Sequence, residues 1–104
     1  MTKSFNFNKV PRKYFSTTLK NGKTYLVAMP KKDTFEALYE IKQVDAEDKD
    51  AVESIYETVA QIVSNNKQGY KVTTEDLKDY DFDEIKQYLE AYTDFVKGLP
   101  EEKN

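Results

Sequence analysis

The pattern of hydrophobic and polar residues changes along the chain from short β-rich runs to helical stripes. Two runs, YFSTTL (14–19) and TYLVAM (24–29), flank the sequence Lys20-Asn21-Gly22-Lys23. Asn-Gly between such runs predicts a β-hairpin with a type I′ turn, in which both central residues have positive φ. The preceding SFNFNKV also alternates and is a candidate third strand, with Pro11 at an edge or in the connection because it has no N–H to donate.

From Asp33 onward, apolar residues recur at three- and four-residue spacing, which predicts helices. Asp33 or Thr34 is expected to cap a first helix that ends around Val44. Its apolar face is expected to hold Phe35, Leu38, Tyr39 and Ile41.

A second helix is predicted to start near Asp45-Ala46-Glu47-Asp48 and to end at Asn65-Asn66 and Gly69. It carries the clearest stripe of the chain: Val52, Ile55, Tyr56, Val59, Ile62 and Val63. The stretch SNNKQGYKVTTEDL (64–77) follows as a polar corner, in which Thr73 or Thr74 starts a short helix to about Tyr80.

The last helix is predicted to begin near Asp81 or Asp83 and to close at Gly98-Pro100. Its core stripe is Phe82, Ile85, Leu89, Tyr92, Val96 and Leu99.

From these elements we predict a single α+β domain over residues 1–99 that is mainly helical. A small hairpin or three-stranded β element (about 3–30) precedes three to four helices (about 33–99), and residues 100–104 form a disordered tail.

The composition removes most enzyme classes. The chain has no His and no Cys, and therefore lacks the usual general base, thiolate nucleophiles and the commonest zinc ligands. No serine lies in a G-x-S-x-G context, and the three glycines do not form a phosphate loop. We expect a protein without catalytic residues, metal or cofactor.

No apolar run approaches the roughly 20 residues of a membrane span and the N-terminus lacks a signal peptide, so a cytosolic location is expected.

The charge is distributed unevenly, with a basic first part, an acidic stretch from Asp45 onward and a net charge of −3. Basic residues interleaved with aromatic ones are typical of single-strand nucleic-acid platforms, but lysines also guard the edges of sheets. The acidic remainder favours the second interpretation, so we do not expect nucleic acid as the main partner. The basic residues concerned are Lys9, Arg12, Lys13, Lys20, Lys23, Lys31 and Lys32, beside Tyr14, Phe15 and Tyr25.

The segment DYDFDEIKQYLE (79–90) places Asp79, Asp81, Asp83 and Glu90 at positions 1, 3, 5 and 12 of a calcium-binding loop. Position 6 of such a loop requires Gly, and this chain has Glu84 there. The same residues fit a helix, so we interpret the acids as a cluster at its N-terminus, where the helix dipole favours them.

Beside its core stripe, the last helix carries a second apolar row formed by Tyr88, Ala91 and Phe95. An exposed row of this kind would be a partner-binding surface. Alternatively, neighbouring helices cover both rows. The three residues are the candidate binding site.

The segments IYETVAQIVSNNKQGYKVTTEDL and YDFDEIKQYLEAYTDFVKGL (residues 55–99) resemble the tail assembly chaperones of long-tailed phages and prophages of Gram-positive bacteria. The shared features are a helix that ends in an SNNKQG-like turn, a Thr-containing start, an acidic helix and an aromatic AYxxFVKGL-like segment. An extended basic segment before the helices is similar in order.

The resemblance implies a small, mainly helical protein that binds the tape measure protein and helps to recruit tail tube subunits, with self-association as a further property to consider. Such a protein would act in the host cytoplasm and be absent from the mature virion. The alternative is a small acidic inhibitor or nucleic-acid mimic of a mobile element, which would bind through carboxylates. A chaperone should instead bind through apolar residues.

Overall fold

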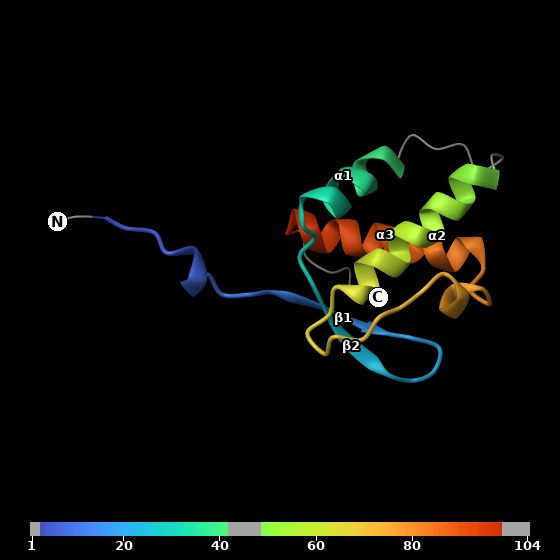
Figure 1. Cartoon of the computed structure of the whole chain (residues 1–104), viewed down its shortest axis with the longest axis horizontal. Coiled ribbons are helices and arrows are strands. Elements are labelled where there is room, and N and C mark those ends of the chain that lie inside the picture. The colour runs from blue at the N-terminus through green and yellow to red at the C-terminus, as the bar shows by residue number, and fades with distance from the viewer. Residues whose placement is uncertain (1–2, 42–48, 99–104) are drawn as a thin grey trace.

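The computed structural model describes residues 3–41 and 49–98. Within these residues, a two-stranded antiparallel hairpin precedes three α-helices, so the predicted mainly helical α+β class is confirmed (Figure 1). The elements in chain order are the 3-10 turn η1 (Phe7–Lys9), β1 (Tyr14–Thr18), β2 (Thr24–Ala28), α1 (Lys32–Ile41), α2 (Lys49–Ser64), the 3-10 turn η2 (Glu75–Leu77) and α3 (Phe82–Lys97).

The hairpin lies where the sequence predicts it, but its turn is of another type. Gly22 has φ of 85°, whereas no described residue other than glycine has positive φ, so the predicted type I′ turn is wrong at Asn21. The Gly22 N–H donates to the Leu19 carbonyl and the Leu19 N–H to the Lys23 carbonyl, each at 2.9 Å. This pattern matches the three-residue loop that a left-handed glycine closes with a bulge. The Asn21 side chain accepts from the Lys23 N–H at 2.9 Å and so takes part without positive φ.

Residues 3–13, here called the N-terminal arm, do not form the predicted third strand. They are all exposed and contain only the turn η1 (Figure 1). The Asn6 Oδ1 accepts from the Asn8 N–H at 2.9 Å. Such a local side-chain bond competes with strand pairing, which explains why an alternating sequence stays outside the sheet.

The corner after α2 covers the free edge of β2. The Asn65 carbonyl accepts from the Ala28 N–H at 2.9 Å, and the Lys67 N–H donates to the Leu26 carbonyl at 2.8 Å. Val27 forms an isolated antiparallel bridge with Asn66. An uncovered edge strand would invite pairing with other chains, so this corner both ends the helix and protects the sheet.

The predicted short helix after this corner is only one 3-10 turn, η2. Thr74 precedes it but makes no side-chain capping bond. Instead, the Asp76 carboxylate accepts from the Thr73 N–H at 2.9 Å, and this local bond fixes a tight turn.

α1 begins at Lys32, before either predicted cap, so Asp33 and Thr34 lie inside the helix and do not cap it. Thr34 and Leu38 are buried, but Phe35 and Tyr39 are 49% and 70% exposed. On an α-helix, positions 34, 38 and 41 share one side and positions 35 and 39 lie beside it, so the predicted apolar face was wrong for the two aromatic residues. The predicted helix end at Val44, the start at Asp45–Asp48, Leu99 and the tail lie outside the described residues.

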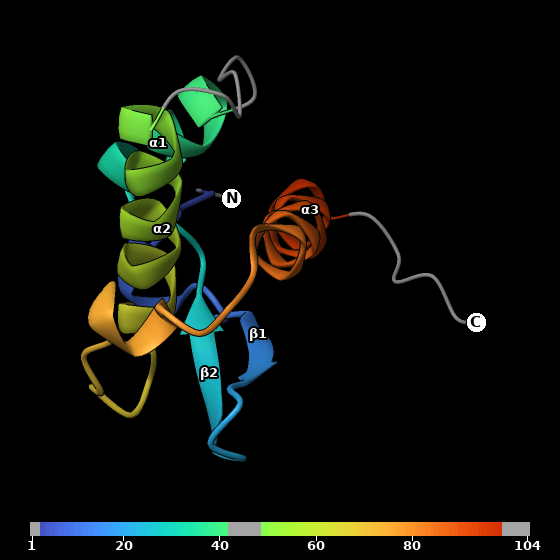
Figure 2. The same cartoon turned by 90° about the vertical axis from the view of Figure 1, so that its right-hand side faces the viewer.

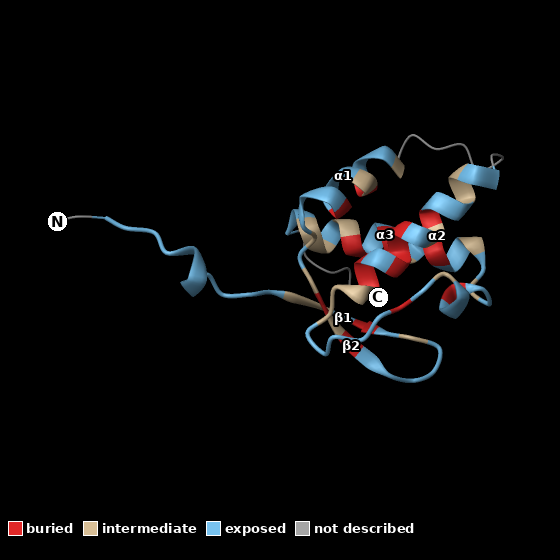
Figure 3. Ribbon diagram, viewed as in Figure 1, coloured by how far each residue is buried: buried red, intermediate tan, exposed pale blue. Residues whose placement is uncertain are grey.

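The core forms where α2 and α3 meet the hairpin (Figures 2 and 3). α3 contributes its predicted stripe, of which Ile85, Leu89 and Tyr92 are buried. Val27 of β2 is fully buried in the same cluster. The Tyr92 hydroxyl donates to the Ala28 carbonyl at 2.9 Å and so ties α3 to the sheet. The other core members are Leu38, Ile55, Val59, Ala60, Ile62, Val63, Val72 and Leu77.

Candidate functional site

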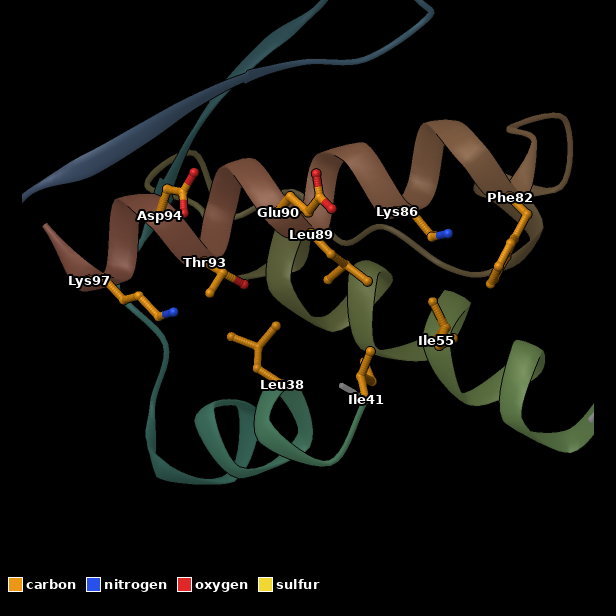
Figure 4. Close-up of a pocket in the computed structure, with 10 residues that line it drawn as sticks. All are labelled: Leu38, Ile41, Ile55, Phe82, Lys86, Leu89, Glu90, Thr93, Asp94 and Lys97. Carbon is orange, nitrogen blue, oxygen red and sulfur yellow. The ribbon is translucent and has the colours of Figure 1, made fainter. Parts of the chain in front are cut away.

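A groove with an apolar floor lies between the three α-helices (Figure 4). α1 supplies Leu38 and Ile41, α2 supplies Ile55, and α3 supplies Phe82 and Leu89. α1 and α3 both pack near α2, and the lining side chains of α1 and α3 face each other across the groove. Its volume is about 650 Å³.

The wall that α3 contributes is polar. Lys86, Glu90, Thr93, Asp94 and Lys97 also line the groove, and all except the half-buried Thr93 are exposed. Their three- and four-residue spacing follows one side of the helix. An apolar floor with a rim of both charges is suited to an amphipathic segment that lays its apolar face in the groove.

Sequence reasoning missed this site. Leu38, Ile55 and Leu89 were each predicted on apolar stripes, but nothing in a stripe indicates which part of it a neighbouring helix leaves uncovered. The available signal was the row of charged residues of both signs at positions 86, 90, 94 and 97 beside the core stripe of the last helix.

The predicted site residues Tyr88 and Phe95 lie on the opposite side of α3 from this groove. Both are half-buried and pack against Phe15 of β1, with ring centroids 5.8 Å and 5.3 Å from that of Phe15. The hairpin therefore covers much of the row formed by Tyr88, Ala91 and Phe95. The alternative expected from the sequence was a cover formed by neighbouring helices.

Tyr88 is also fixed by a hydrogen bond. Its hydroxyl lies 2.8 Å from the Thr17 Oγ1, and Thr17 is buried. Burial raises the pKa of Tyr88 to about 12, while the Thr17 hydrogen bond acts weakly in the other direction. The hydroxyl is thus neutral and structural over the ordinary pH range.

Ala91 is exposed and is the member of the row that the hairpin leaves open. The three residues come together on one face, as predicted, and their role in partner binding stays a prediction. Ala91, in this row, and Thr93, in the groove, lie on different sides of α3.

Residues 79–90 do not form a calcium-binding loop, because α3 begins at Phe82 in the middle of that segment. The Asp81 carboxylate accepts from the Glu84 N–H and the Glu84 carboxylate accepts from the Asp81 N–H, each at 2.8 Å. This capping box confirms the interpretation of the acids as a cluster at the helix N-terminus. In the part of the chain that the structure describes, no group of three or more Asp or Glu residues is arranged to hold a metal ion.

Glu84 also joins α3 to the hairpin turn. The Lys20 Nζ donates to the Glu84 Oε1 at 2.8 Å, and this contact lowers the pKa of Glu84 and raises the pKa of Lys20. Both side chains are largely exposed, so the pair orients the turn more than it stabilises the fold.

Comparison of the chain with protein-family models, with curated proteins and with solved structures found no match. Among the described helices, none is long and apolar enough to cross a membrane.

Proposed function

We propose that this protein is a non-enzymatic tail assembly chaperone of a long-tailed phage or prophage. In this role it binds the tape measure protein in the bacterial cytoplasm, helps to recruit tail tube subunits, and is left out of the mature virion. The observation that carries the proposal is the groove with an apolar floor and a charged rim between α1, α2 and α3.

The groove suits the partner that the sequence resemblance implies. A largely helical tape measure protein would present apolar helix faces, and such faces bind in grooves through residues spaced three and four apart. The half-buried Ile41 and Phe82 would contact this apolar face, over a floor formed by Leu38, Ile55 and Leu89, which are at most 8% exposed. Lys86 and Glu90 would meet polar residues at its margins and so select its orientation.

The test compares two tryptophan variants of α3 in co-expression with the tape measure protein. Thr93→Trp fills the groove with a large side chain, while Ala91→Trp adds the same side chain to the opposite face. Both positions are in the body of one helix; Trp lowers helix propensity relative to Ala but not relative to Thr, so any loss of stability from this cause falls on the control Ala91→Trp. Circular dichroism and thermal melting of each variant show whether the fold is intact.

We expect Thr93→Trp to abolish recovery of the soluble complex and Ala91→Trp to leave it unchanged. The reverse result would move the partner surface to the row Tyr88, Ala91 and Phe95. A third variant, Glu75→Lys with Asp79→Lys, changes exposed carboxylates that cap no helix. If only this variant loses binding, the chaperone surface is wrong and the acidic-mimic alternative gains support.

A further inference from the structure

The N-terminal arm carries two exposed aromatic residues. Phe5 and Phe7 are 71% and 83% exposed, and their rings pack on each other with centroids 4.8 Å apart. The arm leads away from the body of the protein (Figure 1). Its charged residues are Lys3, Lys9, Arg12 and Lys13, without an acid among them. The arm is thus a basic segment with an uncovered aromatic pair.

The outer face of α1 has the complementary character. Phe35 and Tyr39 are one helical turn apart and both exposed. Glu36 and Glu40 alternate with them along the helix, are exposed, and form no ion pair in the described residues; the exposed Lys32, one turn before Glu36, lies on the same side, so the charge of this side is net negative by one. We call the two aromatic residues and the two glutamates the α1 outer face, and it is separate from the groove, to which α1 contributes Leu38 and Ile41.

We propose that the arm of one copy of this chain binds the α1 outer face of a second copy. The two surfaces together hold four of the large apolar residues that the fold leaves exposed, and they have opposite charge. Aromatic rings supply the contact area, and the Lys and Glu side chains around them fix the pairing and disfavour contact between two arms or two α1 faces. Because the two surfaces are different, two arrangements are possible. Two copies can each place their arm on the α1 outer face of the other, or each copy can bind the next one in a head-to-tail series.

The size of the surfaces predicts reversible association. Fully covering an aromatic side chain buries about 150–250 Å², so four rings bury up to about 600–1,000 Å². Stable complexes bury about 1,200–2,000 Å², so this contact belongs to the weak class. Association should therefore appear at high micromolar concentration and be lost on dilution.

The test is sedimentation velocity of the full chain alone, from about 10 μM to about 500 μM. The arm variant is Phe5→Ser with Phe7→Ser, and the face variant is Phe35→Ser with Tyr39→Ser. Met29→Ser is the control, because Met29 is a 38% exposed apolar residue outside both surfaces. All five side chains are exposed, so the variants should fold, which circular dichroism checks.

We expect the average mass of the unmodified chain and of the control to rise above 12.1 kDa with concentration. Each double variant alone should associate at least about tenfold more weakly. A mixture of the two should recover association, because one still has the arm and the other still has the face. A chain that stays at 12.1 kDa throughout, a double variant that associates like the unmodified chain, or a mixture that fails to recover would each overturn the proposal. No tape measure protein is present, so this result is independent of the proposed chaperone function.

Discussion

Replacing Asn66 by alanine should destabilise the fold through loss of the bonds that hold the corner after α2. Its amide nitrogen donates to the carbonyls of Val63 and Tyr70, both at 2.7 Å, and its oxygen accepts from the Tyr70 N–H at 2.9 Å. Each bond contributes about 0.5–1.5 kcal/mol net, and since the residue is half-buried we take the lower part of the summed range, about 2 kcal/mol. For a domain of this size, that loss lowers Tm by about 8–16 °C.

The neighbouring Asn65 provides a matched control. Its side chain makes one bond, from the amide nitrogen to the Met29 carbonyl at 3.2 Å, and its backbone bond to Ala28 survives replacement by alanine. Asn65→Ala should therefore cost only about 0.5 kcal/mol. Urea denaturation followed by circular dichroism measures both variants. If Asn66→Ala is no more destabilising than Asn65→Ala, the structural role assigned to this corner is wrong.

Three further predictions concern local features of the fold. Gly22→Val should lower the free energy of unfolding by about 1–3 kcal/mol, because a β-branched residue is strained at φ of 85°; an unchanged thermal midpoint would contradict the turn geometry. Asp81→Ala should cost about 1 kcal/mol through loss of the capping box, and Asp83→Ala, at an exposed position inside the first turn, is the comparison in the same melting experiment. Because the pKa of Tyr88 is raised in the folded protein, the contribution of its neutral hydroxyl to stability is complete below pH 10 and is lost as the pH rises through about 12. Tm should therefore fall over this pH interval, and should fall less steeply in Tyr88→Phe. Equal slopes for the two proteins would exclude a part for this hydroxyl.

The features that the sequence predicted well are those with local chemical signals. Asp81 and Glu84 form a capping box, and Gly98 ends α3 with φ of 75°, so both ends of this helix were readable from short motifs. The end of α2 before Asn65 and the need for glycine at position 22 follow in the same way. In each case, the residues that determine the structure lie within a few positions of one another.

The features that were missed depend on contacts between distant elements. Phe35 and Tyr39 satisfy helical spacing as well as Leu38 does, and only the packing of α1 on α2 determines which of them is buried. Tyr88 was expected to lie open or beneath a helix, but Phe15, far away in sequence, covers it. The groove is a property of three helices together, so no single stripe could have revealed it.

The central claim is that the groove receives a helical segment of the tape measure protein. The most direct measurement is to follow the methyl NMR signals of leucine and isoleucine while such a segment is added to the protein. We predict that the signals of Leu38, Ile41, Ile55 and Leu89 shift, while those of Leu19 and Leu26 in the hairpin region stay in place. Shifts confined to the hairpin region, or no shifts at saturating concentration of the segment, would contradict the account.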